Sequence, residues 1–129
     1  MKPTDFAKHL TEFLSVYLPS QKNVSKNTIQ SYRDTFKLLI KYCQETKNIK
    51  AERITLDFLS SKLLTGFLEW LENDRKCSIS TRNQRLSAIH SFFRYVQAVL
   101  PVENLSRVHL LHQSLILAFW LYMQELVCL

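Results

Sequence analysis

The sequence is poor in the residues that make tight turns. It holds one glycine and three prolines in 129 residues, so β-hairpins, glycine-rich phosphate loops and many-turned β-sandwiches lack their usual turn residues. Its three cysteines are odd in number, far apart and outside any CxxC pair, which argues against a disulfide framework or a zinc site and favours a reducing cytoplasm. No uninterrupted apolar stretch of signal-peptide length follows the N-terminus. One all-α domain is the expectation.

Apolar residues recur at helical spacing in four segments, each preceded by a residue that can cap a helix. We predict helices at about 5–18, ended by Pro19, and at 26–47. A third helix begins after Ser60 or Ser61 and contains Gly66, which weakens it by roughly 1 kcal/mol relative to alanine. A fourth runs to Pro101. The caps assigned to the first, second and fourth helices are Thr4, Ser25 and Ser80. A polar loop at 48–55 and a connector at 75–79 separate the last three.

The segment from about residue 102 differs from everything before it. No formal charge lies between Arg107 and Glu125, and residues 115–123 form a continuous apolar run of nine. About 20 apolar residues are needed to span a bilayer, so a membrane span is not expected. The segment is interpreted as a buried or self-associating helix; attachment to a membrane surface and a non-native tail are the alternatives. This divides the chain into a domain at 1–101 and a hydrophobic tail at 102–129.

The charge points to a polyanionic partner. The chain carries 17 Lys and Arg against 11 Asp and Glu, a formal net charge of +6, which favours nucleic acid or an anionic surface. On the second predicted helix a polar and basic stripe recurs at spacings of 4, 3, 4 and 4, in the series Lys26, Gln30, Arg33, Lys37 and Lys41. Such a stripe can follow a phosphate backbone, although a solvated helix face has the same pattern.

The fourth helix carries the second basic region. Residues 75–102 contain no acidic side chain and the five basic ones Arg75, Lys76, Arg82, Arg85 and Arg94. The helix start presents Ser80, Thr81, Arg82, Asn83 and Arg85 beside free backbone N–H groups, and Asn83, Ser87, His90 and Arg94 share one flank. Helix starts of this kind suit phosphate, and arginine and asparagine can pair with base edges.

Catalytic and metal-binding patterns are missing from the sequence. His109 and His112 are three residues apart, but no carboxylate or thiol lies near enough in the sequence to complete a metal site. The chain has no GxSxG, Walker A, HExxH or GxGxxG motif. We therefore expect no catalytic residue, metal, cofactor or small-molecule substrate.

Three segments, taken together, resemble the N-terminal core-binding domain of tyrosine recombinases, the phage and transposon integrase family. They are SKNTIQSYRDTF at 25–36, the region of ITLD at 54–57 followed by FLEWL at 67–71, and STRNQRLSAIHSFFRY at 80–95. The resemblance covers about residues 4–100. It implies a SAM-like orthogonal bundle of four helices, here followed by the hydrophobic C-terminal helix.

The resemblance also implies a function in DNA recombination and integration. Double-stranded DNA is the expected partner, with contacts from Lys26, Asn27, Thr28, Arg33, Lys37, Thr81, Arg82, Asn83, Arg85 and Arg94. Both helices would straddle one duplex, so Arg33 and Arg85 are expected on one cationic surface. The core positions it implies are Phe36, Trp70, Leu86, Phe93 and Tyr95.

The family's strand-cleaving chemistry belongs to a later domain with a nucleophilic tyrosine and an H-x-x-R element, and this chain has no H-x-x-R. A non-catalytic domain in the cytoplasm is therefore predicted. The alternative is a helical interaction module that forms homo-oligomers through residues 102–129.

Overall fold

All the regular structure described for this chain is helical. The fold is known from a computed structural model, which describes residues 2–21 and 23–100. No strand occurs within these ranges, so the predicted all-α class is confirmed. The predicted apolar helix, and the domain boundary before it, lie outside the described residues.

The first helical rod joins α1 (Asp5–Glu12), the π-helical turn η1 (Phe13–Tyr17) and α2 (Leu18–Ser20). Thr4 caps it as predicted, because its Oγ1 accepts a hydrogen bond from the Ala7 N–H at 3.2 Å. One face of the rod, carrying Phe6, Leu10, Phe13 and Leu18, is buried. The rod therefore supplies one complete wall of the core.

The predicted helix end at Pro19 is wrong, because the rod continues to Ser20. In a regular α-helix the ring of Pro19 would meet the carbonyl of Ser15. The π turn relieves this crowding, since it is wider and pairs residues five apart, as in the bond from the Leu18 N–H to the Phe13 carbonyl. The same widening places Phe13 and Leu18 both in the core.

The longest helix is α3 (Lys26–Lys47), with the predicted bounds. Ser25 caps its start, and Asn48 ends it in the left-handed conformation at φ 53°. After the short 3-10 helix η2 (Ala51–Arg53) the chain enters a loop whose Ile54, Leu56 and Leu59 are buried. This connection thus closes the core as well as joining two helices.

The last two helices are α4 (Ser61–Asn73) and α5 (Ile79–Val99). Ser60 caps α4, one of the two predicted residues. The cap of α5 is Ser78, so the prediction of Ser80 is wrong: the Ser78 Oγ accepts from the Thr81 N–H at 3.1 Å. Lys76, at φ 56°, turns the chain early and lets the helix begin two residues sooner.

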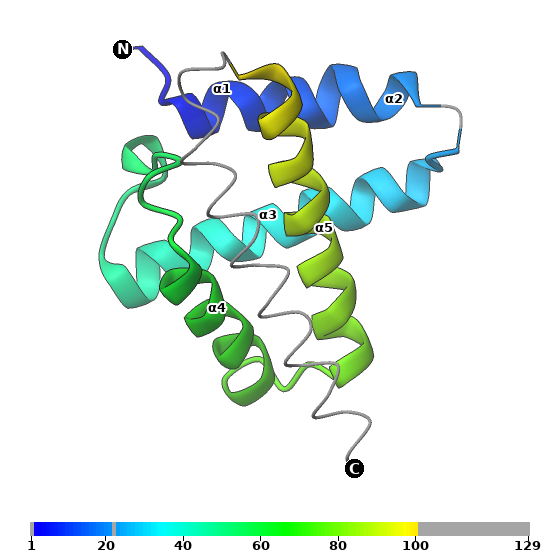
Figure 1. The fold of residues 1–129 in the computed structure, drawn as a ribbon. Helices are drawn as coiled ribbons and strands as arrows, with labels where there is room; N and C mark the ends of the chain where they lie inside the picture. The colour runs from blue at the N-terminus through cyan, green and yellow to red at the C-terminus, as the bar shows by residue number, and fades with distance from the viewer. Residues whose placement is uncertain (1, 22, 101–129) are drawn as a thin grey trace.

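An aromatic cluster joins the helices. The Phe92 ring lies 5.2 Å from that of Phe36, 5.5 Å from Phe13 and 5.8 Å from Phe6, so α5 packs on both α3 and the first rod. All five core positions implied by the resemblance are buried: Phe36, Trp70, Leu86, Phe93 and Tyr95. Figure 1 shows α1 and α2 as one rod along one edge of the molecule. The helix α5 crosses in front of α3, and α4 lies beside α5.

Candidate nucleic-acid interface

The starts of α3 and α5 are built in the same way. In each, a serine caps the helix and bonds the threonine three residues on, Ser25 with Thr28 and Ser78 with Thr81. The two hydroxyl oxygens are 3.0 Å apart in both pairs. Each helix start therefore presents serine and threonine hydroxyl groups together with backbone N–H groups that lack a partner within the helix, and α5 also exposes Ile79 there.

The Arg85 side chain links α5 to α3 between one and two turns from each helix start. There the Arg85 Nη1 donates to the Ser31 carbonyl at 3.1 Å and to the Thr35 Oγ1 at 3.2 Å. Asn27 precedes Ser31, and Thr81 precedes Arg85, by one turn each, or about 6 Å along its helix. We call this region the helix-start corner and define it by Lys26, Asn27 and Thr28 of α3 and Ser80, Thr81 and Gln84 of α5.

Arg82 and Arg85 have partners inside the bundle. The Arg82 side chain is buried, with 5% of its surface exposed, and its guanidinium pairs with the Glu72 carboxylate of α4. Arg85 is half-buried at the crossing. Both were predicted as DNA contacts. The structure shows Arg82 joining α5 to α4 and Arg85 joining α5 to α3, because arginine can bring a long apolar stem into the core and still find acceptors there.

The basic stripe of α3 is exposed, but it turns away from Arg85. Successive helical residues are about 100° apart, and Arg33 is two residues from both Ser31 and Thr35. It therefore lies about 160° around the helix from each of them. Those two residues are the ones that Arg85 contacts. The expectation that Arg33 and Arg85 share one cationic surface is therefore wrong: Arg33 and Lys37 lie over the groove between α3 and the first rod, where they line an open pocket.

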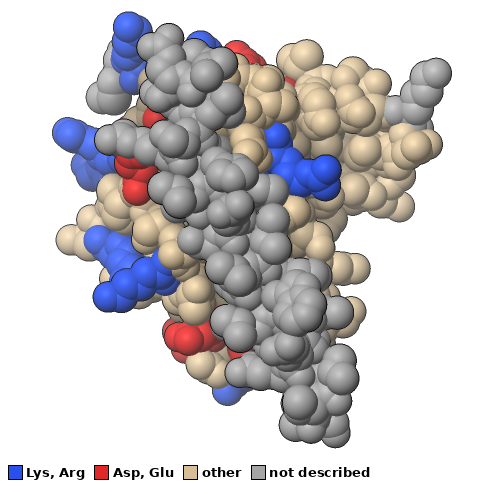
Figure 2. All heavy atoms as spheres, in the orientation of Figure 1, with Lys and Arg blue, Asp and Glu red and all other residues tan. Residues whose placement is uncertain are grey.

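The predicted flank of α5 is polar and weakly charged. Arg94 is exposed, while Asn83 and His90 are half-buried. Figure 2 looks onto the side where α5 crosses α3, and the lysines and arginines visible there form separate patches with acidic groups between them.

Comparison with known proteins assigns the chain to a family. The family model for the phage integrase N-terminal SAM-like domain matches residues 10–98. The chain belongs to this family. The SAM-like fold implied by the resemblance is confirmed.

Two relatives from Sinorhizobium fredii (strain NBRC 101917 / NGR234) agree with this SAM-like assignment. "Putative integrase/recombinase y4rC" is 38% identical over 103 residues, covering 80% of this chain and 31% of the relative. "Putative integrase/recombinase y4rD" is 39% identical over 86 residues, covering 67% and 31%. The aligned part is thus about a third of the length of these relatives. No solved structure is significantly similar to the chain.

Within the described part of this SAM-like domain, no group of histidine, cysteine or acidic side chains is placed to hold a metal ion. The helices described there are also too short or too polar to cross a membrane. Burial raises the pKa of the Cys43 thiol to about 11, although Lys47 partly opposes this, so Cys43 is not a reactive thiolate at neutral pH. The matched region is the family's N-terminal domain.

The predicted DNA contacts include four of the six corner residues but not Gln84. Lys26, Asn27, Thr28 and Thr81 were all predicted, and Ser80 was assigned to the exposed helix start. Gln84 carries no charge and fits no motif. Its position one turn after Ser80 on the exposed side of α5 was the available signal.

Proposed function

We propose that this SAM-like domain binds double-stranded DNA through the helix-start corner, and so positions a recombinase or integrase on its target. The observation that carries the proposal is that Arg85 links α3 to α5 within two turns of their starts, which are capped in the same way. A duplex placed in this corner would meet both first turns at once.

The chemistry of the corner suits phosphate. Lys26 supplies a positive charge, and the first-turn N–H groups of α3 and α5 add the partial positive charge of two helix dipoles. Thr28 and Thr81 offer hydroxyl groups, which commonly contact the DNA backbone. Asp34, the nearest carboxylate on α3, accepts a hydrogen bond from Gln30 at 3.0 Å.

The amide side chains at the corner suit base edges. Asn27 and Gln84 are exposed, and asparagine and glutamine can form two hydrogen bonds with adenine in the major groove. Few such groups are present, so we infer that most of the affinity comes from the backbone and that sequence reading is limited.

Arg82 and Arg85 have a positioning function in this proposal. Arg85 holds the angle between the two helix starts, and Arg82 ties the start of α5 to α4. Strand cleavage is assigned elsewhere in the recombinase, since the chain lacks H-x-x-R. The domain is therefore proposed as a non-catalytic module. Its cytoplasmic location and its self-association through residues 102–129 stay predictions.

The test compares DNA affinity between matched variants of the full chain. Replacing Lys26, Asn27 and Gln84 together by alanine should weaken binding to a labelled recombination-site duplex by at least about tenfold, which is 1.4 kcal/mol. Replacing Lys47, Gln44 and Gln97 by alanine, three residues outside the corner, is the control and should change binding less than about twofold. Fluorescence anisotropy measures both, and circular dichroism confirms the fold.

Normal affinity of the corner variant would overturn the proposal. So would a loss confined to Arg33→Ala/Lys37→Ala, because that result would place the duplex over the groove rim, about two to three turns away from the start of α3.

A further inference from the structure

The groove between the first rod and α3 is a second surface with its own chemistry. It contains an open pocket of about 330 Å³. Leu10 and Leu14 line it from the rod, Phe36 and Ile40 from α3, and Arg33 and Lys37 form its charged rim. In each pair the residues are four positions apart, so apolar and cationic groups run parallel along the groove.

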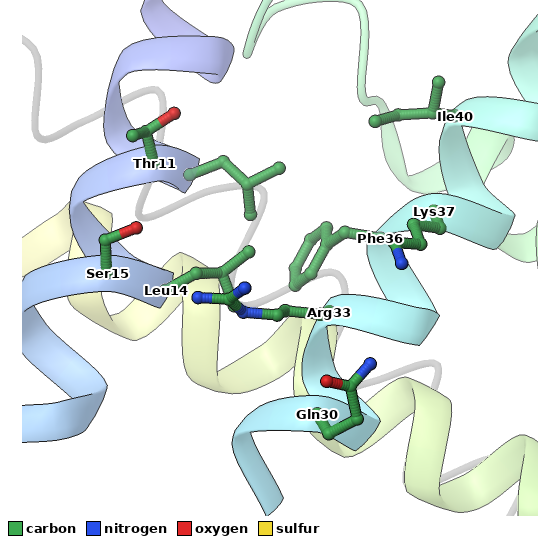
Figure 3. A pocket seen from close by; sticks show the side chains of 9 residues that line it. Thr11, Leu14, Ser15, Gln30, Arg33, Phe36, Lys37 and Ile40 are labelled. Atoms are coloured by element: carbon green, nitrogen blue, oxygen red, sulfur yellow. The ribbon is translucent and has the colours of Figure 1, made fainter. Parts of the chain in front are cut away.

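The floor of this groove is apolar and its rim is cationic. Phe36 and Leu10 form the buried floor, while Leu14 and Ile40 remain half-exposed. Figure 3 shows the Phe36 ring pointing into the pocket and the Arg33 side chain reaching from α3 toward Leu14. None of the pocket-lining residues is acidic.

Neither rim cation is in an ion pair within the described residues, where the ion pairs join Lys41 to Glu45 and Arg82 to Glu72. Glu12 accepts a hydrogen bond from the Tyr95 hydroxyl at 3.3 Å, on the α5 side of the rod. Asp34 is bonded to Gln30 at 3.0 Å. The positive charge of Arg33 and Lys37, both exposed, is therefore available to an anionic group that also buries apolar surface.

Duplex DNA is a poor match for this groove. Its backbone would meet the two cations, but it has no apolar side chain to cover Leu14 and Ile40. The groove also lies on the side of α3 away from the residues that Arg85 contacts, as the position of Arg33 around α3 shows. A partner with apolar and acidic groups side by side fits better.

We propose that this groove binds an amphipathic helix of a partner protein, with apolar residues on its inner face and carboxylates on the flank beside Arg33 and Lys37. Apolar residues at i and i+4 of such a helix are about 6 Å apart, the same repeat as Leu10 to Leu14 and Phe36 to Ile40. The carboxylates at i and i+4 on its flank then face the two cations in the same register. This inference stands on the groove alone and does not require the chain to bind DNA.

The test uses the full chain and two synthetic helical peptides of equal length, both with leucine at i and i+4, one with glutamate and the other with lysine on the flank. The glutamate peptide should bind saturably and shift the NMR amide signals of Leu14, Arg33 and Ile40. The lysine peptide should bind at least tenfold more weakly.

Charge reversal provides the decisive variant. Arg33→Glu/Lys37→Glu should invert the preference, so that the lysine peptide binds more tightly than the glutamate peptide. Both side chains are exposed, so the fold is expected to survive, and Lys41→Glu/Lys47→Glu is the matched control that should keep the parental preference.

Four outcomes would overturn the proposal. Two concern direct binding: no saturable binding of the glutamate peptide, or equal affinity for both peptides. The other two are displacement of the bound glutamate peptide by dodecanoate below its micellar concentration, or by a second copy of the chain. Dodecanoate displacement would identify a small amphiphile as the ligand. Displacement by the chain itself, with a dimer in light scattering that the charge reversal abolishes, would identify a self-association surface.

Discussion

Gly66 lies in the middle of α4 at a place where a side chain has no room. A Cβ built there would come 2.5 Å from the Tyr42 hydroxyl oxygen, and the next nearest atom, the ring carbon bearing that hydroxyl, is 3.6 Å away. Tyr42 is buried and packs against Phe67 and Trp70, so its ring has little freedom to move. The glycine lowers helix propensity, but it permits close packing of α3 and α4.

This close contact predicts that a mutation at Tyr42 can relieve the destabilising effect of a mutation at Gly66. Gly66→Ala alone should destabilise the domain by about 1–2 kcal/mol, since the overpacking exceeds the gain in helix propensity. Tyr42→Phe removes the clashing oxygen, so adding Gly66→Ala to it should be neutral or stabilising. Urea unfolding of the four proteins measures the coupling; equal effects of Gly66→Ala in both backgrounds would contradict the clash.

Cys43 makes stability depend on pH in the alkaline range. Burial raises the pKa of its thiol to about 11 in the folded domain, against about 8.5 in an unfolded chain. Because the folded pKa is the higher one, this group's contribution is fully present below about pH 8.5 and is lost as pH rises toward 11.

We expect the free energy of unfolding to fall between pH 8.5 and 10 more steeply for the parent than for Cys43→Ala. Tyr42 and Tyr95, whose pKa values are also raised by burial, are unchanged in this variant and are shared by both proteins. Urea unfolding at half-unit pH steps measures the two slopes. Parallel curves would show that Cys43 stays protonated or titrates equally in both states.

At the scale of elements, the structure shows which of two serines caps α5, a choice that the sequence alone does not settle. Ser78 accepts from the Thr81 N–H and is the cap, whereas Ser80 lies exposed within the first turn. Ser78→Ala should therefore cost about 1 kcal/mol. Ser80→Ala, its matched control, should stay within about 0.5 kcal/mol. Thermal unfolding decides between them, and the reverse order would restore Ser80 as the cap.

The Arg82–Glu72 pair links α5 to α4 from within. Because Arg82 is buried and Glu72 only partly so, Arg82→Ala should destabilise the domain by about 1–3 kcal/mol through lost packing and an unpaired carboxylate. Arg94→Ala, on the exposed flank of the same helix, should change stability by less than about 0.5 kcal/mol. Similar urea midpoints for the two variants would argue against a structural function for Arg82.

Sequence periodicity predicted the helices well because each carries a continuous apolar stripe and a polar cap. The bounds of α3 were predicted correctly, and the cap of α4 is Ser60, one of the two serines predicted. The π turn before Pro19 was not, since an apolar spacing of five residues fits no regular helix pattern. The polar loop predicted at 48–55 did not indicate that Ile54, Leu56 and Leu59 close the core, a packing that depends on α1 lying beside this segment.

At the scale of the whole molecule, the positive charge of α3 is divided along its length. The helix-start corner holds Lys26 and two helix dipoles, and Arg33 and Lys37, about two and three turns further along the same side of α3, form the groove rim. Sequence correctly located the exposed basic residues of α3 but could not say which side α5 would take. That choice depends on Arg85 bonding Ser31 and Thr35, contacts between residues 54 and 50 positions apart.

This division predicts the salt dependence of DNA binding. The slope of log affinity against log salt is about −0.9 for each phosphate neutralised. Lys26→Ala should make the slope less negative by about one phosphate, whereas Arg33→Ala should leave it unchanged if the duplex lies in the corner. Anisotropy titrations from low to physiological salt give both slopes. Equal changes in slope for the two variants would mean that the duplex contacts both the helix-start corner and the groove rim.

The Asp5 carboxylate has a practical consequence. Its Oδ1 accepts the Leu56 N–H at 2.9 Å, so one short side chain fastens the beginning of the domain to the loop ahead of α4. Fragments designed for crystallisation or fusion should start upstream of Thr4. Trimming past Asp5 would release α1 from the loop ahead of α4 and leave the Leu56 N–H in the interior without an acceptor.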